Sequence, residues 1–291
     1  MELTILGSGG CTCIPRPGCV CPVCVEAREK GIPYSRSGPS LFLHDIHALF
    51  DTPEDIVSQL NRESIQSIHH IFYTHWHPDH TLGMRVIEQL SMNFLARHLN
   101  VPYHPKKIKV CAVPQVMDDL MSIQNKWGSF LKYYAENKLI SLTLLKENVP
   151  LRIASFKITP ILSFYPSPHT TLFVIEENDT KVVYFPSHCK PWEPLLTHPL
   201  LRNISVLIIG DILPNGPLKG CYEIPAGNTL HDETLSLDEL TTIIEPLGAE
   251  RTFVVHIEEE WGKSYRDYAR MEEHYAGYGI HFTHDGMKIM V

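Results

Sequence analysis

The stretch "YTHWHPDH", residues 73–80, places three histidines and an aspartate within six positions, directly after the apolar run "IHHIF". That run predicts a strand, in which alternate side chains point the same way. His75 and His77 would therefore share a face at the strand's end, and the proline after them suits the first position of a helix. Asp79 and His80 would then lie in the first helical turn and point back toward the strand. No other feature constrains the fold as strongly, because a strand and a helix must meet at one point.

These four side chains offer the nitrogen and oxygen donors of a metal site. Neutral imidazole and carboxylate suit zinc, and also iron or manganese. A metal held there with an open coordination position lowers the pKa of its bound water to about 7, which makes hydroxide available at neutral pH. The alternative is a surface loop rich in histidine, but the spacing after a strand favours a metal site.

Strand and helix patterns recur in two similar halves, with no Pro/Ser/Gly-rich linker between them. The pattern predicts a single α/β domain over residues 1–291, built of two sheets flanked by helices. Within it we expect a cysteine loop at about 11–39 and a helical insertion at about 114–138. Apolar spacing predicts a helix over 81–99. The segment "SLDELTTIIEPLG" predicts a helix that opens with a capping box, and "IHFTHDGMKIMV" predicts a hairpin at its Asp-Gly pair.

Charge and hydropathy exclude some partners. The formal net charge is −8 without a dense Lys/Arg tract, which does not favour long nucleic acid. No apolar run reaches membrane-spanning length, and "MELTILGSGG" lacks the basic start of a signal peptide. We therefore expect a cytoplasmic protein, in which the eight cysteines are metal ligands or free thiols rather than disulfides.

The order His-x-His-x-Asp-His after a strand resembles the signature of the metallo-β-lactamase fold superfamily. The resemblance implies an αββα sandwich of two mixed β-sheets flanked by helices, with the metal site along one edge. In dinuclear members the first two histidines hold one metal, and the aspartate and last histidine hold the other. Carried over, His75 and His77 belong to the first metal and Asp79 and His80 to the second.

The same resemblance implies further ligands later in the chain. His169 precedes a strand as the third ligand of the first metal should, and His256 ends a strand as the last ligand of the second should. The bridging aspartate is missing, because its position reads Ser187, followed by His188. Asp211, which ends "LIIGD", is the nearest acidic substitute, although it could equally cap a loop. His188 is the other candidate ligand.

A cluster of three cysteines forms the pattern C-x-C-x-x-C: Cys19, Cys21 and Cys24. Three thiolates this close can gather on one structural zinc, and a short proline-containing loop preorganises them. The loop resembles that of the carbon–phosphorus lyase pathway phosphodiesterases, where the fourth ligand is a histidine three residues after the last catalytic one. Glu259 stands at that position here, and Cys11 and Cys13 are the other candidates.

Two polar residues near strand or helix ends have supporting roles by the same resemblance. Asp51 ends the strand "ALFD", where the superfamily has an aspartate that orients a metal-bound imidazole through its other ring nitrogen. His231 precedes a helix in a region where the phosphodiesterases have a histidine that protonates the leaving oxygen. As alternatives, Asp51 caps its strand and His231 is a surface residue.

These patterns lead to a functional hypothesis. We expect a metal-dependent hydrolase, a phosphodiesterase that acts on a small cyclic or nucleotide-type phosphodiester through metal-bound hydroxide, with Asp79 and His231 as catalytic residues. Its cofactors would be one structural zinc and one or two catalytic zinc ions, with manganese or iron as alternatives at the catalytic site. The expected partner is the small-molecule substrate, with no long nucleic acid and no membrane, and a homodimer is one expected assembly.

Two other functions stay open. The cysteine loop, "FDTPEDI" and "VVYFPSHC" resemble pyrroloquinoline quinone biosynthesis protein B, which would make the chain an iron-dependent oxidoreductase. That family has lost most of the histidine motif, whereas this chain keeps all four of its ligands. The missing bridging aspartate also suits a non-catalytic zinc-binding sensor or partner protein.

Overall fold

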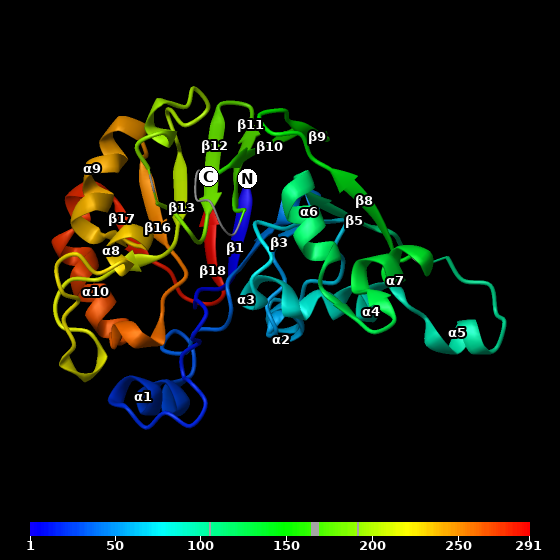
Figure 1. Cartoon of the computed structure of the whole chain (residues 1–291), viewed down its shortest axis with the longest axis horizontal. Helices are drawn as coiled ribbons and strands as arrows, with labels where there is room; N and C mark the ends of the chain where they lie inside the picture. Colours follow the sequence, from blue (N-terminus) through cyan, green and yellow to red (C-terminus); the bar gives the residue numbers. More distant parts are fainter. Residues whose placement is uncertain (105, 164–168, 191) are drawn as a thin grey trace.

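A computed structural model describes residues 1–104, 106–163, 169–190 and 192–291 of the chain. Two seven-stranded mixed sheets pack against each other and helices lie outside them (Figure 1). This arrangement confirms the expected αββα sandwich. The first and last strands of the chain lie side by side in one sheet, so the two termini are neighbours (Figure 1).

The first sheet has the strand order β18-β1-β2-β3-β4-β5-β8. Its strands are β1 (Glu2–Gly7), β2 (Ser40–Leu43), β3 (Ala48–Phe50), β4 (His70–Phe72), β5 (Ile108–Ala112), β8 (Ile140–Leu144) and β18 (Met287–Met290). Strands β3, β4, β5 and β8 pair in parallel, so their carboxyl ends share one edge of the sheet. Strand β4 therefore delivers the histidine segment to that edge.

The second sheet has the order β17-β16-β13-β12-β11-β10-β9. Its strands are β9 (Leu151–Ile153), β10 (Phe156–Leu162), β11 (Thr171–Glu177), β12 (Thr180–Phe185), β13 (Val206–Ile209), β16 (Arg251–Val254) and β17 (Ile280–Phe282). Strands β12, β13 and β16 are parallel neighbours. The loops that carry His188, Asp211 and His256 follow the carboxyl ends of these three strands, which places all three loops at one edge.

Two small pairs of strands stand apart from the large sheets. One joins β14 (Ile212–Leu213) to β15 (Leu235–Ser236), and the other is the hairpin of β6 (Gln124–Asn125) and β7 (Gly128–Ser129). The hairpin lies inside the segment for which the sequence predicts a helical insertion.

Helices and loops make up the rest of the described chain. The α-helices are α1 (Pro22–Lys30), α2 (Ile56–Arg62), α3 (Pro78–Thr81), α4 (Val86–Ser91), α5 (Phe94–His98), α6 (Pro114–Met121), α7 (Phe130–Glu136), α8 (Leu230–Glu233), α9 (Leu237–Leu247) and α10 (Tyr265–His274). The 3-10 helices are η1 (His44–Ile46), η2 (Leu82–Arg85), η3 (Leu195–Thr197), η4 (Lys219–Cys221), η5 (Glu259–Trp261) and η6 (Ala276–Tyr278). The capping box predicted for α9 is confirmed, because Ser236 and Glu239 bond reciprocally at its start.

Aromatic side chains fill the space between the two sheets. The rings of Phe50 and Phe72, from β3 and β4, each lie 5.5 Å from that of Phe173 on β11. Phe50 also contacts Tyr184 of β12 at 5.6 Å. All four side chains are buried. Burial of large apolar groups of this kind is the main force that holds the sheets face to face.

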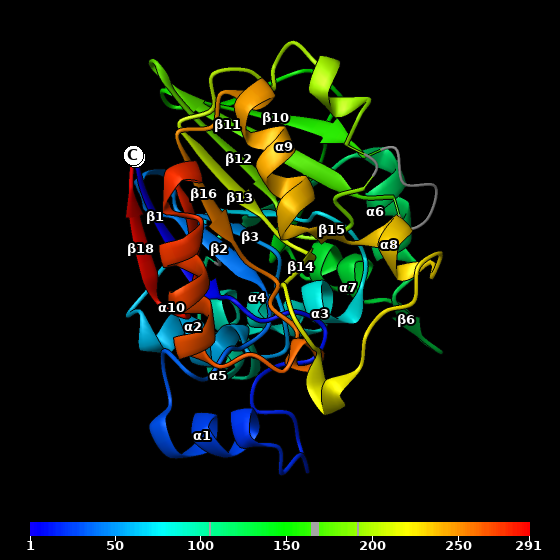
Figure 2. The same ribbon diagram turned by 90° about the vertical axis from the view of Figure 1, so that its left-hand side faces the viewer.

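A second apolar core lies on the outer face of the second sheet, under α9 and α10 (Figure 2). Leu240 and Leu247 of α9 and Tyr268 of α10 pack there with Leu207 and Val254 of the sheet.

In the described part of the chain, no helix is both long enough and apolar enough to cross a bilayer.

Two predictions about local structure are wrong. The helix expected over 81–99 is split into η2, α4 and α5, because Met92 leaves the helical conformation and the Asn93 side chain caps a new helix at the N–H of Ala96. The hairpin expected at the C-terminus does not form either. Strand β17 pairs with β16 in one sheet, whereas β18 pairs with β1 in the other.

Candidate metal centre

The histidine motif occupies the end of β4 and the start of α3. Residues 73–77 follow the strand, and Pro78 opens the helix at a position where a missing N–H costs little. His77 precedes the helix with extended backbone angles, while Asp79 and His80 lie inside its single turn. The short helix therefore turns Asp79 and His80 back toward the strand end, as the sequence predicts.

One group of three imidazoles forms around His75. The ring nitrogens of His75, His77 and His188 lie within 4.8 Å of one another. His188 Nε2 is 3.3 Å from His77 Nδ1, and the His188 ring lies edge-on to that of His75 at 5.0 Å. Two histidines come from the first sheet and the third from the loop after β12, so the group joins the two sheets.

His75 carries the clearest sign of a missing ligand. Its side chain is fully buried, and among the described residues its Nε2 has no hydrogen-bond partner. The other ring nitrogen, Nδ1, lies 3.0 Å from Oγ1 of Thr74. Burial lowers the pKa of His75 well below its usual value, and the neighbouring histidines lower it further. A neutral imidazole with one unpaired nitrogen is the form in which histidine binds metals.

A second group lies directly beside the first. Asp79 Oδ2 is 3.3 Å from His80 Nε2 and 3.2 Å from His256 Nε2, and the two Nε2 atoms are 3.3 Å apart. The rings of His75 and His80 lie 4.1 Å apart, which makes the two groups contiguous. Each group offers three donors, so the residues present fit one metal ion each, of a kind that accepts imidazole and carboxylate.

Asp51 orients this second group through the ring of His80. Its Oδ2 lies 2.8 Å from His80 Nδ1, and its two oxygens accept the backbone N–H and the hydroxyl of Thr74, both at 2.8 Å. The carboxylate thereby favours the tautomer of His80 that carries its proton on Nδ1 and presents Nε2 to the centre. The residue is fully buried at a positive φ of 62°, a strained conformation that the surrounding hydrogen bonds hold in place.

Asp211 contacts both groups. Its Oδ1 lies 2.9 Å from His256 Nδ1, and its Oδ2 accepts the backbone N–H of His188 at 2.6 Å. Because Asp211 meets the Nδ1 side of His256, it lies behind that ring, while Nε2 faces Asp79. Asp211 therefore supports His188 and His256, and with His256 and Glu258 it also forms a further group of three possible donors. Its role as a metal ligand stays a prediction.

Opposite charges adjust the protonation of the centre. Burial by itself raises the pKa of Asp79, but the charge of His80 and hydrogen bonds from His256 and His80 outweigh it and hold that pKa well below its usual range. The same opposition brings the pKa of Asp211 to about 2, with His256 as the main lowering cause. Both carboxylates are therefore ionised, which is the form that a cation requires.

Glu258, two residues after His256, supports the centre and contacts the N-terminal loop, a role that the sequence analysis did not assign. Its Oε1 lies 3.2 Å from His256 Nδ1 and accepts the backbone N–H of Cys11 at 2.9 Å. A Cβ at Gly10 would lie 2.1 Å from that oxygen, so the loop can approach only as glycine. In the sequence, the one sign of this role is that Glu258 lies two residues after His256. Glu258 also begins a run of three glutamates, a pattern typical of a solvent-exposed segment.

His169 does not lie where the resemblance predicts. The structure groups His188, and not His169, with His75 and His77. His169 is half-exposed, and its Nδ1 lies 3.6 Å from a carboxylate oxygen of Asp119 on α6. His188, from the loop after β12, is the third imidazole beside His75 and His77 in this structure.

His231 is exposed on the short helix α8. Its backbone N–H donates to the carbonyl of Asn228 at 3.0 Å, and its backbone carbonyl accepts from Nζ of Lys190 at 2.6 Å. Lys190 also pairs with Glu239 at 2.7 Å, so it ties α8 to the start of α9. The role of the His231 imidazole as a proton donor stays a prediction.

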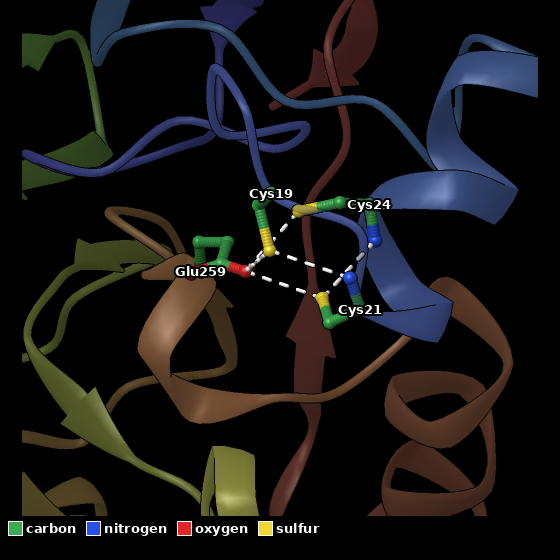
Figure 3. A group of neighbouring side chains, drawn as sticks. All are labelled: Cys19, Cys21, Cys24 and Glu259. Atoms are coloured by element: carbon green, nitrogen blue, oxygen red, sulfur yellow. Dashed lines mark hydrogen bonds between the residues drawn. The ribbon is translucent and has the colours of Figure 1, made fainter.

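The cysteine cluster forms a separate four-residue group with Glu259 (Figure 3). The Sγ atoms of Cys19, Cys21 and Cys24 point toward one oxygen, Glu259 Oε1, at 3.3, 3.3 and 3.1 Å. Three sulfurs and one oxygen converging in this way suit a four-coordinate zinc. The carboxylate that replaces the expected histidine is fully buried and comes from η5, immediately after the His256 loop.

Lys219 is the residue that accompanies this replacement, and the sequence analysis did not single it out. Its Nζ lies 2.5 and 2.7 Å from the two oxygens of Glu259 and 3.2 Å from Cys19 Sγ. Burial raises the pKa of Glu259, but Lys219 and the thiols lower it to about 2. Three thiolates and a carboxylate exceed the charge of one zinc ion, and Lys219 offsets part of the excess.

Comparison with known proteins identifies related folds. A family model for the beta-lactamase superfamily domain matches residues 47–257. No curated protein matches the chain in sequence.

Several solved structures resemble the chain over nearly its whole length. A diphosphatase of the PhnP family is 21% identical, with a TM-score of 0.73 over 99% of this chain and 96% of that one. Zinc-bound PqqB from Methylobacterium extorquens is 18% identical, with a TM-score of 0.73 over all of both chains. The short form of human tRNase Z is 14% identical, with a TM-score of 0.63 over 100% of this chain and 99% of that one. At these identities the likeness concerns the fold.

Proposed function

This chain belongs to the metallo-β-lactamase superfamily, and from that premise we propose that it is a metal-dependent hydrolase of a small phosphodiester. The observation that carries the proposal is the contact between two donor groups, three imidazoles around His75 and the set of Asp79, His80 and His256. Adjacent cation sites suit in-line displacement at phosphorus, because both the attacking and the leaving oxygen need charge stabilisation.

A divalent metal in these groups supplies Lewis acidity and makes a nucleophile available at neutral pH. The protein's own residues fix the geometry. Asp51 sets the tautomer of His80 at 2.8 Å, and Asp211 holds both the His256 ring and the backbone of His188. Residues that orient ligands in this way commonly affect metal affinity or activity about 10–100-fold.

The leaving oxygen requires a proton when it departs as an alkoxide. We assign this role to His231 on α8, as the sequence predicts. Its helix is anchored by Lys190, which donates to the His231 carbonyl at 2.6 Å. Proton donation by a positioned side chain is typically worth about 10²–10⁴-fold in rate.

The substrate we propose is small. The net charge of −8 disfavours a long phosphate backbone. Among the proteins of similar fold are a diphosphatase of the PhnP family and a tRNase Z, and their names support chemistry at a phosphate ester or anhydride. A small cyclic or nucleotide-type phosphodiester agrees with both considerations.

The test is hydrolysis of bis(p-nitrophenyl) phosphate and of a 2′,3′-cyclic nucleotide by the protein loaded in turn with zinc, manganese and iron. We expect turnover with at least one metal, and its loss in the Asp79→Ala variant. Absence of turnover on both substrates with every metal would overturn the proposal. Turnover that survives in the Asp79→Ala variant would trace the activity to a contaminant.

A second candidate is an iron-dependent oxidoreductase. One specific observation favours it: the first donor group holds three neutral imidazoles and no carboxylate, a set that also suits redox-active metals. The fold shared with PqqB supports it at the level of architecture. Elemental analysis of protein purified without added metal separates the candidates, because iron as the sole catalytic metal favours the oxidoreductase and zinc favours the hydrolase. Metal bound without turnover on any tested ester would favour a sensor or partner protein.

A further inference from the structure

A cavity of about 800 Å³ lies between the metal-centre helix and the insertion that follows β5. One wall comes from α3, η2 and α4 and includes Thr81, Leu82 and Arg85. The facing wall comes from the β6–β7 hairpin and α7 and includes Trp127, Phe130 and Tyr133. Volumes of this size are typical of sites for small organic ligands.

The cavity shares its wall with the candidate metal centre. Thr81 directly follows His80, and its hydroxyl donates to the carbonyls of Trp76 and His77 at 3.0 and 2.9 Å. The turn that holds the ligand histidines therefore also forms one side of the cavity. The cavity and the metal centre therefore lie on either side of one short turn.

The facing wall exposes aromatic rings that the fold itself does not use. Trp127 is 84% exposed at the two-residue tip of the β6–β7 hairpin, and Tyr133 is 43% exposed on α7. Large aromatic surface left in water forgoes the stabilisation that burial supplies. Nζ of Lys126 lies 4.8 Å from the centre of the Trp127 ring on one side. Exposed rings that line a cavity are suited to stack on a planar ligand.

A cation stands on the opposite wall. Arg85 ends η2, five positions after His80, and within the described part of the chain no carboxylate lies within ion-pair distance of its guanidinium. A guanidinium binds a phosphate through two parallel hydrogen bonds. Planar rings on one side and a free guanidinium on the other match the two chemical parts of a nucleotide.

We propose that this cavity binds the nucleobase end of the substrate, with the aromatic rings against the base and Arg85 on a phosphate. The assignment of that ligand as a substrate rests on the proposed phosphodiesterase function, whereas the binding site itself does not. The enzyme would therefore act on a nucleotide-type phosphodiester in preference to one without a base.

The test compares two ligands that carry the same phosphate, adenosine 5′-monophosphate and ribose 5-phosphate, by calorimetry on the metal-loaded protein. Stacking of a base on an aromatic side chain supports a preference for the adenosine ligand of roughly 10-fold or more. In the Trp127→Ala and Tyr133→Ala variants that ratio should shrink several-fold. In the Tyr278→Ala variant, which removes a half-exposed ring from η6 outside the cavity, the ratio should be unchanged.

Arg85→Met has a different signature, since it should weaken both ligands by a similar factor and leave the ratio intact. Equal affinity of the parent protein for the two ligands, or a ratio unaffected by both aromatic variants, would overturn the proposal. The ratio is measured without turnover. If the protein hydrolyses bis(p-nitrophenyl) phosphate but shows no preference for the adenosine ligand, only the cavity assignment is wrong. If it prefers the adenosine ligand but hydrolyses neither test substrate, only the proposed function is wrong.

Discussion

Asp211 lies 2.9 Å from Nδ1 of His256 through one carboxylate oxygen. Its other oxygen accepts the backbone N–H of His188 at 2.6 Å, so one side chain supports a residue of each donor group. Each group draws residues from both sheets, and Asp211 ties the loop after β12 to the loop after β16. Its removal should therefore affect metal binding more than the loss of an ordinary surface acid.

The first prediction concerns this support. Asp211→Asn keeps the size of the side chain and an acceptor for His188 but removes the negative charge beside His256. We expect metal affinity at the Asp79, His80 and His256 group to fall by roughly 10–100-fold. Competition titration with a chelator measures it. Asp232→Asn, an exposed acid on α8, is the matched control, and equal affinities in the two variants would contradict the assignment.

The second prediction tests which histidine, His188 or His169, is the third metal ligand beside His75 and His77. His188→Ala should lower the metal content of the His75 group, because its Nε2 lies 3.3 Å from Nδ1 of His77. His169→Ala should leave the metal content nearly unchanged, because that residue is half-exposed beside Asp119. Elemental analysis of both variants gives the answer. Metal loss only in the His169 variant would show that His169 is the third ligand, as the family resemblance implies.

The third prediction concerns the cysteine cluster. Cys21→Ser should remove about one zinc per chain and lower the melting temperature, because binding of a structural zinc contributes folding free energy. Cys221→Ser is the control, since that exposed cysteine lies outside the group of four. Zinc counts by elemental analysis and melting curves test both. Full zinc content in the Cys21 variant would reject the structural site.

The fourth prediction tests the proton donor. His231→Ala should slow hydrolysis of substrates with poor leaving groups by about 10²–10⁴-fold, because general-acid help matters most there. The same variant should barely change the rate on bis(p-nitrophenyl) phosphate, whose phenolate leaves without a proton. Asp79→Ala should slow both substrates alike. If the His231 variant loses the same factor on both, the residue is not the acid.

The fifth prediction is a pH dependence of stability away from the metal centre. Burial lowers the pKa of His70 to about 4, with help from the nearby cations Lys109 and His69. Because the unfolded chain binds a proton near pH 6.5 and the folded chain only near 4, this residue's contribution is present above pH 6.5 and is lost as the pH falls toward 4. His70→Phe should flatten the decline of melting temperature between pH 6.5 and 4. An unchanged slope would show that His70 is not the group responsible.

Sequence patterns predicted the local structure correctly where the residues that decide it lie within one short segment. The strand before His75, the helical turn that places Asp79 and His80, and the capping box of α9 depend on neighbours within a few residues, and all three are found. The predicted helix over 81–99 failed because Asn93 starts a new helix, a competing local signal that apolar spacing does not reveal. The final hairpin failed because its two strands join different sheets.

The sequence by itself determined the superfamily, the αββα class, the four residues of the candidate metal centre that lie in one motif, and the three cysteines, since each is written in short motifs with fixed spacing. Only the tertiary structure decided that His188 joins His75 and His77, that Asp211 stands behind His256, and that Glu259 and Lys219 complete the cysteine cluster. These contacts join residues about 40 to 240 positions apart. They form where loops at the carboxyl ends of strands in two sheets meet, and that meeting depends on how the sheets pack rather than on any local pattern.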